Sequence, residues 1–188
     1  MDVYLNPNER KLDEKTLAKA KKELNENPKQ REIDIESTKN WILKQNYMNS
    51  RLDDDFIISY LRAAKYSYAK TQDLIRNNWI NRTEMADWFH DRNYDEDSVT
   101  MEIADIGIYF PLPKTDDEGK LVIVQRMGLL NVEKYDFNDL AKYVFSVLDI
   151  ISQDPRIQIN GVSQIFFEVK IFSKNITLGF DFDGYDRI

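Results

Sequence analysis

The segment from Leu52 to Tyr66 constrains the fold of this chain most strongly, because its pattern is that of a short, capped helix. Asp53 or Asp54 can accept hydrogen bonds from the free backbone N–H groups of the first helical turn. Apolar residues then recur every three or four positions, as they do on the buried face of an amphipathic helix: Phe56, Ile57, Tyr60, Leu61 and Ala64. This segment is therefore predicted to be a helix that packs on a core.

The rest of the first half is also predicted to be helical. Asn27 and Pro28 open one helix, with Pro28 at its first helical position, and Ser67 can cap another. In three predicted helices the residues expected on the buried side follow helical spacing: Leu17, Ala20 and Leu24 in the first, Ile35, Thr38 and Ile42 in the second, and Leu74, Ile75, Trp79 and Met85 in the third.

After Ser98 the pattern changes to strands around a helix. Residues 109–115 form an extended piece with two prolines, residues 116–119 read as a turn, and residues 121–124 read as a buried strand. A helix from Phe137 to Ser152, apolar on more than one side, precedes a second apolar run at residues 162–167. Strand, helix and strand in this order predict two parallel strands joined by a right-handed crossover.

Composition limits the classes of function. The net charge of −7 argues against a large nucleic-acid surface, and the absence of cysteine excludes thiol nucleophiles and thiolate metal sites. His90 is the only histidine, and no P-loop, Rossmann glycine run or G-x-S-x-G motif occurs, so no enzymatic activity is expected. No secretory signal or membrane-spanning apolar stretch is visible, which predicts cytoplasmic residence without a transmembrane segment.

The Leu52–Tyr66 segment resembles the D-x-F-[LI]-x-x-[FY]-L-R-A-x-[KR]-[FY] pattern that opens CRAL-TRIO proteins, which carry retinoids, tocopherol and phospholipids. Residues 107–140 resemble the start of that family's lipid-binding domain, in its alpha-tocopherol-transfer-like and retinaldehyde-binding-like branch. The resemblance implies an α+β or α/β protein. Residues 1–97 would form the helical N-terminal domain, and residues 98–188 a partial lipid-binding domain with its first βαβ portion.

The resemblance ends near Phe166. Where the family continues with Asp-x-Glu-Gly, this chain has Phe167, Glu168, Val169 and Lys170, and its sequence diverges from about residue 167. A C-terminally truncated form with an incomplete pocket is therefore expected, and an ending that closes the fold differently is the alternative.

The family resemblance places ligand contacts on the helix between the first two strands of the βαβ unit and on those strands. The candidates are Ile123, Val144, Phe145, Leu148, Ile151 and Phe166. Plain core packing is the alternative for each, because a pocket and a core use the same apolar residues.

Some CRAL-TRIO proteins also bind phosphoinositide headgroups through basic residues of the opening segment. Arg62 and Lys65 match two such residues, but Ala64 stands where many relatives have another basic side chain, so a surface Arg–Lys pair is the favoured alternative. The run at residues 181–186 is too short for a calcium loop, and no metal or cofactor is predicted.

The predicted function is non-enzymatic intracellular binding and transfer of a small hydrophobic ligand: a tocopherol, a retinoid or a phospholipid. Burial of the ligand's apolar surface would supply the driving force. Transient membrane contact is the second interaction considered, and nucleic acid is not an expected partner. The alternative function is that of a protein- or membrane-interaction module that binds no lipid.

Overall fold

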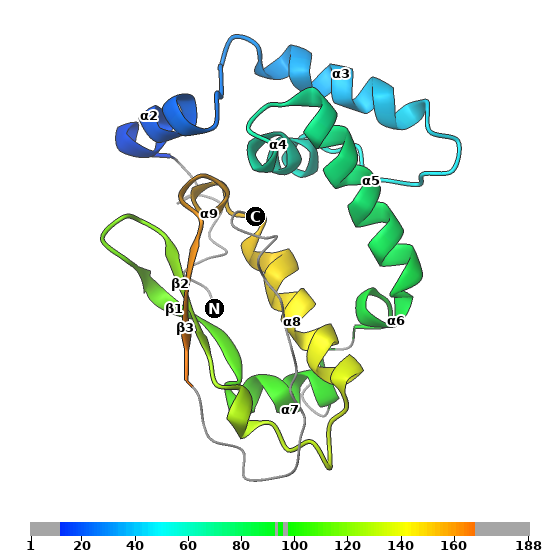
Figure 1. Cartoon of the computed structure of the whole chain (residues 1–188), viewed down its shortest axis with the longest axis vertical. Helices are drawn as coiled ribbons and strands as arrows, with labels where there is room; N and C mark the ends of the chain where they lie inside the picture. The colour runs from blue at the N-terminus through cyan, green and yellow to red at the C-terminus, as the bar shows by residue number, and fades with distance from the viewer. Residues whose placement is uncertain (1–11, 93, 96–97, 168–188) are drawn as a thin grey trace.

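The computed structural model describes residues 12–92, 94–95 and 98–167. The first part of this chain is helical and lies at the top of Figure 1. Its elements are α2 (Glu14–Glu23), α3 (Arg31–Leu43), α4 (Asp54–Ala63), α5 (Tyr68–Glu84) and α6 (Ala86–Phe89). The second part combines helices with a small sheet. Its elements are α7 (Val99–Ile106), β1 (Tyr109–Thr115), β2 (Leu121–Gln125), the 3-10 turn η2 (Met127–Leu129), α8 (Phe137–Ile151), α9 (Pro155–Asn160) and β3 (Val162–Phe166).

Helix α4 is the helix predicted from the Leu52–Tyr66 segment. The Asp53 carboxylate caps it by accepting a hydrogen bond of 3.0 Å from the backbone N–H of Phe56, and Arg51 holds that carboxylate with two further bonds of 2.7 and 2.8 Å. The apolar stripe of α4 buries Ile57 and Leu61 in the core of the helical part. The other buried members of this core come from the neighbouring segments: Ile35, Ile42, Met48 and Ile75.

The predicted start of α3 was wrong by three residues. Pro28 lies in a turn in which the backbone N–H groups of Gln30 and Arg31 bond to the Asn27 carbonyl, and the regular helix begins at Arg31. An asparagine and a proline favour a turn as readily as a helix start, so the local signal does not separate the two. The residues predicted to be buried by α3 are buried: Ile35, Thr38 and Ile42.

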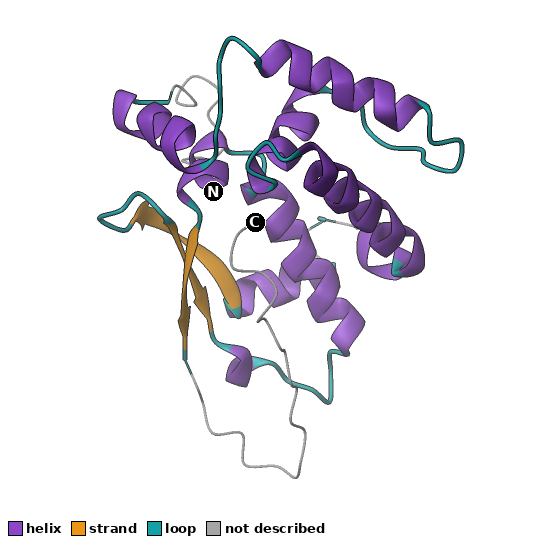
Figure 2. Cartoon of the chain, turned by 45° about the horizontal axis from the view of Figure 1, so that its top comes forward, coloured by secondary structure: helices purple, strands orange, loops and turns teal. Residues whose placement is uncertain are grey.

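The predicted βαβ unit is confirmed. The sheet has the order β1-β2-β3 in the described chain, with β1 antiparallel and β3 parallel to β2. Helix α8 connects β2 to β3 and covers one face of the sheet, and Figure 2 shows the strands beside the surrounding helices. The buried core between them contains Leu121 and Ile123 from β2, together with Leu140, Val147 and Ile151 from α8.

Two short helices fall outside the sequence predictions. Ser98 caps α7 through a 3.3 Å bond from the Met101 backbone N–H, and Gly107 ends it with a positive φ of 67°. Asp154 caps α9, and Pro155 fills its first position. Both carry ordinary cap signals, but their apolar pattern is too short to show a helical period.

The two parts of the described chain touch along α8 and α9. Helix α6 contacts α8, and both α2 and α4 contact α9. Helix α8 therefore has the sheet on one side and the helical part on the other (Figure 1). The predicted domain boundary between residues 97 and 98 stays a prediction.

Candidate functional site

The candidate site is defined by which side of α8 faces each of its neighbours. Leu140, Val147 and Ile151 face the sheet core. The Tyr143 hydroxyl donates a 2.6 Å hydrogen bond to the Tyr109 carbonyl, so the flank that carries Tyr143 faces β1. Successive residues of a helix are 100° apart, which places Val144 and Leu148 on the opposite flank, away from β1. That flank is turned toward β3, the outer strand of the described sheet.

Strand β3 adds side chains to the same face of the sheet. Its register pairs Val162 with Leu121, Gln164 with Ile123 and Phe166 with Gln125. Directly paired residues share a face, so these three β3 side chains lie on the side covered by α8. We call the surface made by Val144, Leu148, Val162 and Phe166 the α8–β3 face. Its first three members are half-buried against the sheet core, whereas Phe166 is 58% exposed.

One polar pair interrupts this apolar surface. The buried Gln125 donates a 2.8 Å hydrogen bond from Nε2 to Oε1 of the exposed Gln164. Neither glutamine was predicted, because their meeting depends on the register between β2 and β3. The free hydrogen-bonding groups of the Gln164 amide can orient a polar end of a ligand that lies on the face.

The structure separates the predicted ligand contacts into three groups. It brings Val144, Leu148 and Phe166 to the α8–β3 face. Ile123 and Ile151 lie beneath that face in the core, at 0% and 4% exposure. Phe145 lies on another side of α8, where its ring stacks on Trp88 of α6 with centroids 5.5 Å apart.

The expectation that Arg62 lies at the surface was wrong. The Arg62 side chain is 5% exposed, and it donates to both Glu26 carboxylate oxygens at 2.9 and 3.1 Å and to Gln158 Oε1 at 2.7 Å. Lys65 is exposed, so the two residues do not form a surface pair. The arginine of the opening segment thus joins α4 to the loop before α3 and to α9. Phosphoinositide binding by Arg62 and Lys65 stays a prediction.

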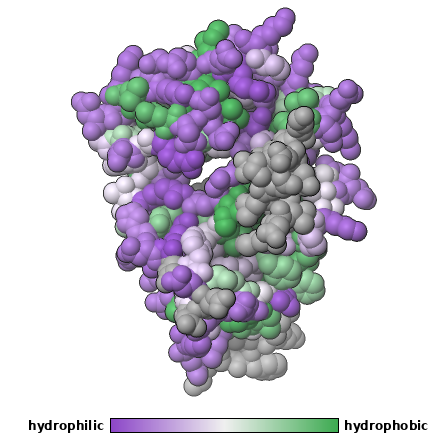
Figure 3. Space-filling view, turned by 180° about the vertical axis from the view of Figure 1, so that it is seen from behind, coloured by the Kyte–Doolittle hydropathy of each residue, from purple (hydrophilic) through white to green (hydrophobic). Residues whose placement is uncertain are grey.

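Glu26 is the centre of this buried network. Burial opposes ionisation of its carboxyl, but hydrogen bonds and charge attraction from Arg62 and Arg31 hold its pKa below the usual value. A cleft of about 400 Å³ adjoins the network and is lined by residues of both parts, among them Leu17, Arg62 and Gln158. Figure 3 shows the rear face of the molecule hollowed between its upper and lower parts.

The described residues provide neither a metal cluster nor a membrane-spanning helix. Within residues 12–92, 94–95 and 98–167, no group of three or more His, Cys, Asp or Glu side chains is arranged to hold a metal ion. The acidic run at residues 181–186 and the sequence that follows Phe167 lie outside the described residues. No helix of the described chain is long and apolar enough to cross a membrane.

Known proteins are similar in sequence to most of this chain. The family profile described as "Pinta-like, UBA domain" matches residues 27–99. Clavesin-1 of Pongo abelii is 28% identical over 151 residues, which is 80% of this chain and 42% of the relative. The alpha-tocopherol transfer protein-like protein of Mus musculus is 27% identical over 152 residues, and clavesin-2 of Homo sapiens is 26% identical over 151; both matches cover 80% of this chain.

These similarities and the confirmed fold define a class of protein with a helical part followed by a βαβ unit. The relatives are CRAL-TRIO proteins, and their similarity over 80% of this chain supports the same family for it. It spans less than half the length of the curated relatives described here, with 42%, 43% and 46% of each one covered.

Proposed function

We propose that this protein binds a small hydrophobic ligand on the α8–β3 face and transfers it without catalysing a reaction. The single observation that carries the proposal is the apolar flank of α8, which is turned toward the outer strand instead of being sealed in the core. The name of one relative, alpha-tocopherol transfer protein-like, supports a ligand of this kind.

The driving force would be removal of apolar surface from water. A bound ligand would cover the ring of Phe166 and the exposed parts of Val144 and Leu148. Each Å² of apolar surface buried in this way, on the protein or on the ligand, contributes about 25 cal/mol to the binding free energy. Gln164 would supply a hydrogen bond to one polar group. A long apolar molecule with one polar end fits this combination best, and the class comprises tocopherols, retinoids and phospholipids. Transient membrane contact and cytoplasmic residence belong to the same proposal.

Thermal unfolding with and without retinol, α-tocopherol and phosphatidylcholine tests the proposal. A ligand that binds only the folded chain, at about one hundred times its Kd, adds roughly 2.7 kcal/mol to the free energy of unfolding. For a chain of this size that corresponds to a rise in Tm of about 5–10 °C. No rise with any of the three would contradict the proposal.

Phe166 and Ile165 provide a matched pair of variants. Both are exposed apolar residues of β3, but neighbouring strand residues point to opposite faces of a sheet. Phe166→Ser should reduce the ligand-induced rise in Tm, whereas Ile165→Ser should leave it intact. Equal losses in both variants would instead favour the alternative function, an interaction module that uses the exposed end of β3, and vesicle flotation and solution size would then be measured.

A further inference from the structure

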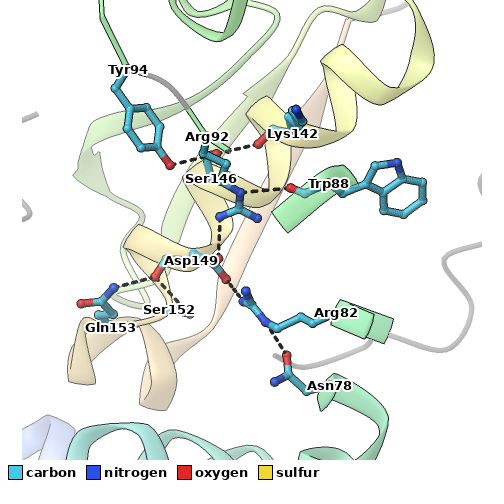
Figure 4. Close-up of polar contacts among 10 residues, drawn as sticks. All are labelled: Asn78, Arg82, Trp88, Arg92, Tyr94, Lys142, Ser146, Asp149, Ser152 and Gln153. Atoms are coloured by element: carbon cyan, nitrogen blue, oxygen red, sulfur yellow. Dashed lines mark hydrogen bonds and ion pairs between the residues drawn. The ribbon is translucent and has the colours of Figure 1, made fainter. Parts of the chain in front are cut away.

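Asp149 occupies the side of α8 that faces the helical part. Its two carboxylate oxygens accept hydrogen bonds from two arginines, one from Arg82 Nη2 at 2.5 Å and one from Arg92 Nη1 at 2.7 Å (Figure 4). Arg82 belongs to α5, and Arg92 follows α6. One carboxylate of the βαβ unit thus binds two separate segments of the helical part. We call Asp149, Arg82 and Arg92 the arginine clamp.

Further contacts fix both arginines in place. Arg82 Nε donates to Asn78 Oδ1 at 3.1 Å, and Arg92 Nε donates to the Trp88 carbonyl at 3.0 Å. Both guanidinium groups also face the ring of Phe89, at 4.4 and 5.1 Å from its centroid. The attraction between a cation and an aromatic face strengthens when water is excluded. The arginines are therefore held in position before they meet Asp149.

The clamp depends on the single negative charge of Asp149. The Arg92 side chain is only 10% exposed, and its buried Nη2 has no hydrogen-bond acceptor among the residues that the structure describes. Without Asp149, the two cations of the helical part would lie side by side against α8 with no carboxylate to neutralise them, and Arg92 would stay nearly buried. The desolvation of Arg92 would then be uncompensated and the two arginines would repel each other, so the packing of the helical part against α8 would weaken.

The clamp is coupled to the α8–β3 face through the geometry of the helix. Asp149 directly follows Leu148, and the two side chains leave α8 about 100° apart. Because α8 is a rigid helix of 15 residues, its rotation about its own axis sets the direction of every side chain at once. The ion pairs of Asp149 with Arg82 and Arg92 therefore also fix the directions of the Val144 and Leu148 side chains.

We propose that Asp149 is a positioning residue for the hydrophobic ligand: by binding Arg82 and Arg92 it holds α8 so that Val144 and Leu148 face β3. This role rests on the proposed function. The helical part then acts on the ligand without touching it. Loosening the clamp turns α8 and speeds ligand release, while the apolar side chains of the face stay unchanged.

Ligand release from the full chain tests the role. Dissociation of whichever of retinol, α-tocopherol and phosphatidylcholine the wild type binds is followed by stopped-flow fluorescence. Asp149→Asn should release it about tenfold faster, within the range by which residues away from a ligand alter coupling. Asp149→Glu keeps the charge and should restore most of the retention. Asp73→Asn, which breaks the exposed pair between Asp73 and Arg76, is the matched control and should release at the wild-type rate.

The salt dependence of ligand release distinguishes repulsion between Arg82 and Arg92 from a loss of packing. Raising the NaCl concentration from 0.05 to 0.5 M shortens the Debye length to about 4 Å and screens the two uncompensated arginines. The fast release of Asp149→Asn should therefore slow down with salt, whereas the fast release of a Leu148→Ala variant should not. Arg82→Gln, a milder change at a partly exposed residue, removes one arginine and should give a smaller acceleration in case Asp149→Asn folds poorly.

Hydrogen exchange on the ligand-free chain separates the two proposals. Faster exchange across α8 in Asp149→Asn, together with faster release, supports the positioning role. If the wild type binds none of the three ligands, the proposed function fails and this role fails with it. If the wild type binds a ligand and Asp149→Asn releases it at the wild-type rate, the proposed function stands and the positioning role is overturned.

Discussion

Glu26→Gln removes the only carboxylate that contacts Arg62 among the described residues, and the cost of the substitution follows from the burial of the pair. The side chains of Glu26 and Arg62 are 3% and 5% exposed. Removing one partner from a buried ion pair costs about 3–5 kcal/mol, because the other charge stays buried without compensation. The low end applies, since Arg62 keeps its bond to Gln158 and the one-third exposed Arg31 can turn into water. We expect a loss of about 3 kcal/mol, equivalent to a Tm about 6–12 °C lower.

Urea unfolding followed by circular dichroism at pH 7 measures this loss. The control is Asp73→Asn, the same kind of change at an exposed pair, which should lie within about 0.5 kcal/mol of the wild type. A loss below about 1 kcal/mol for Glu26→Gln is typical of a surface pair and would refute the reasoning.

The stability that Glu26 contributes should depend on pH in one direction only. The pKa of Glu26 is lowered from 4.5 in the folded chain, so its ionised form contributes stability that is fully present above 4.5. That contribution disappears as the pH falls through the folded-state pKa. The difference in unfolding free energy between wild type and Glu26→Gln should therefore be constant from pH 5.5 to 7 and shrink below pH 4.5. A difference that grows on acidification would contradict the buried ion pair.

Two further variants test the packing of the βαβ unit. Tyr143→Phe removes the donor to the Tyr109 carbonyl and should lower the free energy of unfolding in urea by about 1–2 kcal/mol. Burial also raises the pKa of Tyr143 to about 12. The difference between the absorbance titrations of wild type and variant, which reports Tyr143 alone, should therefore show no ionisation near pH 10. Gly107→Ala should lower the free energy of unfolding by about 1–2 kcal/mol, measured by thermal unfolding. Gly107 has a φ of 67°, and a Cβ at this position would collide with the Arg126 guanidinium. Unchanged stability would contradict this backbone strain.

The parts of the fold that the sequence predicts are those set by neighbours along the chain. The Asp53 cap and the bounds of α8 follow from patterns within about twenty residues, and the parallel pairing of β2 with β3 follows from the order strand, helix, strand along the chain. The predicted fold class is confirmed for this reason. The start of α3 shows the limit of the same method, since Asn27 and Pro28 suit a turn and a helix start equally well.

The burial of Arg62 depends on contacts between distant residues. Glu26 lies 36 residues before Arg62, and Gln158 lies 96 residues after it. A surface pair of Arg62 with Lys65 was favoured from the sequence, because no local pattern reveals a carboxylate that arrives from the loop before α3. The same holds for Asp149, whose partners Arg82 and Arg92 are 67 and 57 residues away. Ion pairs of this kind can be found in the sequence only after the packing of helices is known.

The predicted ligand contacts on α8 stay predictions, and they could be proposed from the sequence because this helix is apolar on more than one side. Val144 and Phe145 are neighbours in the sequence, and hydrophobicity alone gives them the same role. In the structure one turns toward β3 and the other packs against Trp88, because the Tyr143 hydroxyl and the Asp149 carboxylate fix the rotation of the helix from two sides. The polar residues of α8 therefore decide which apolar residues remain available to a ligand. An apolar helix of this length defines a binding face only when polar contacts with its neighbours set its rotation.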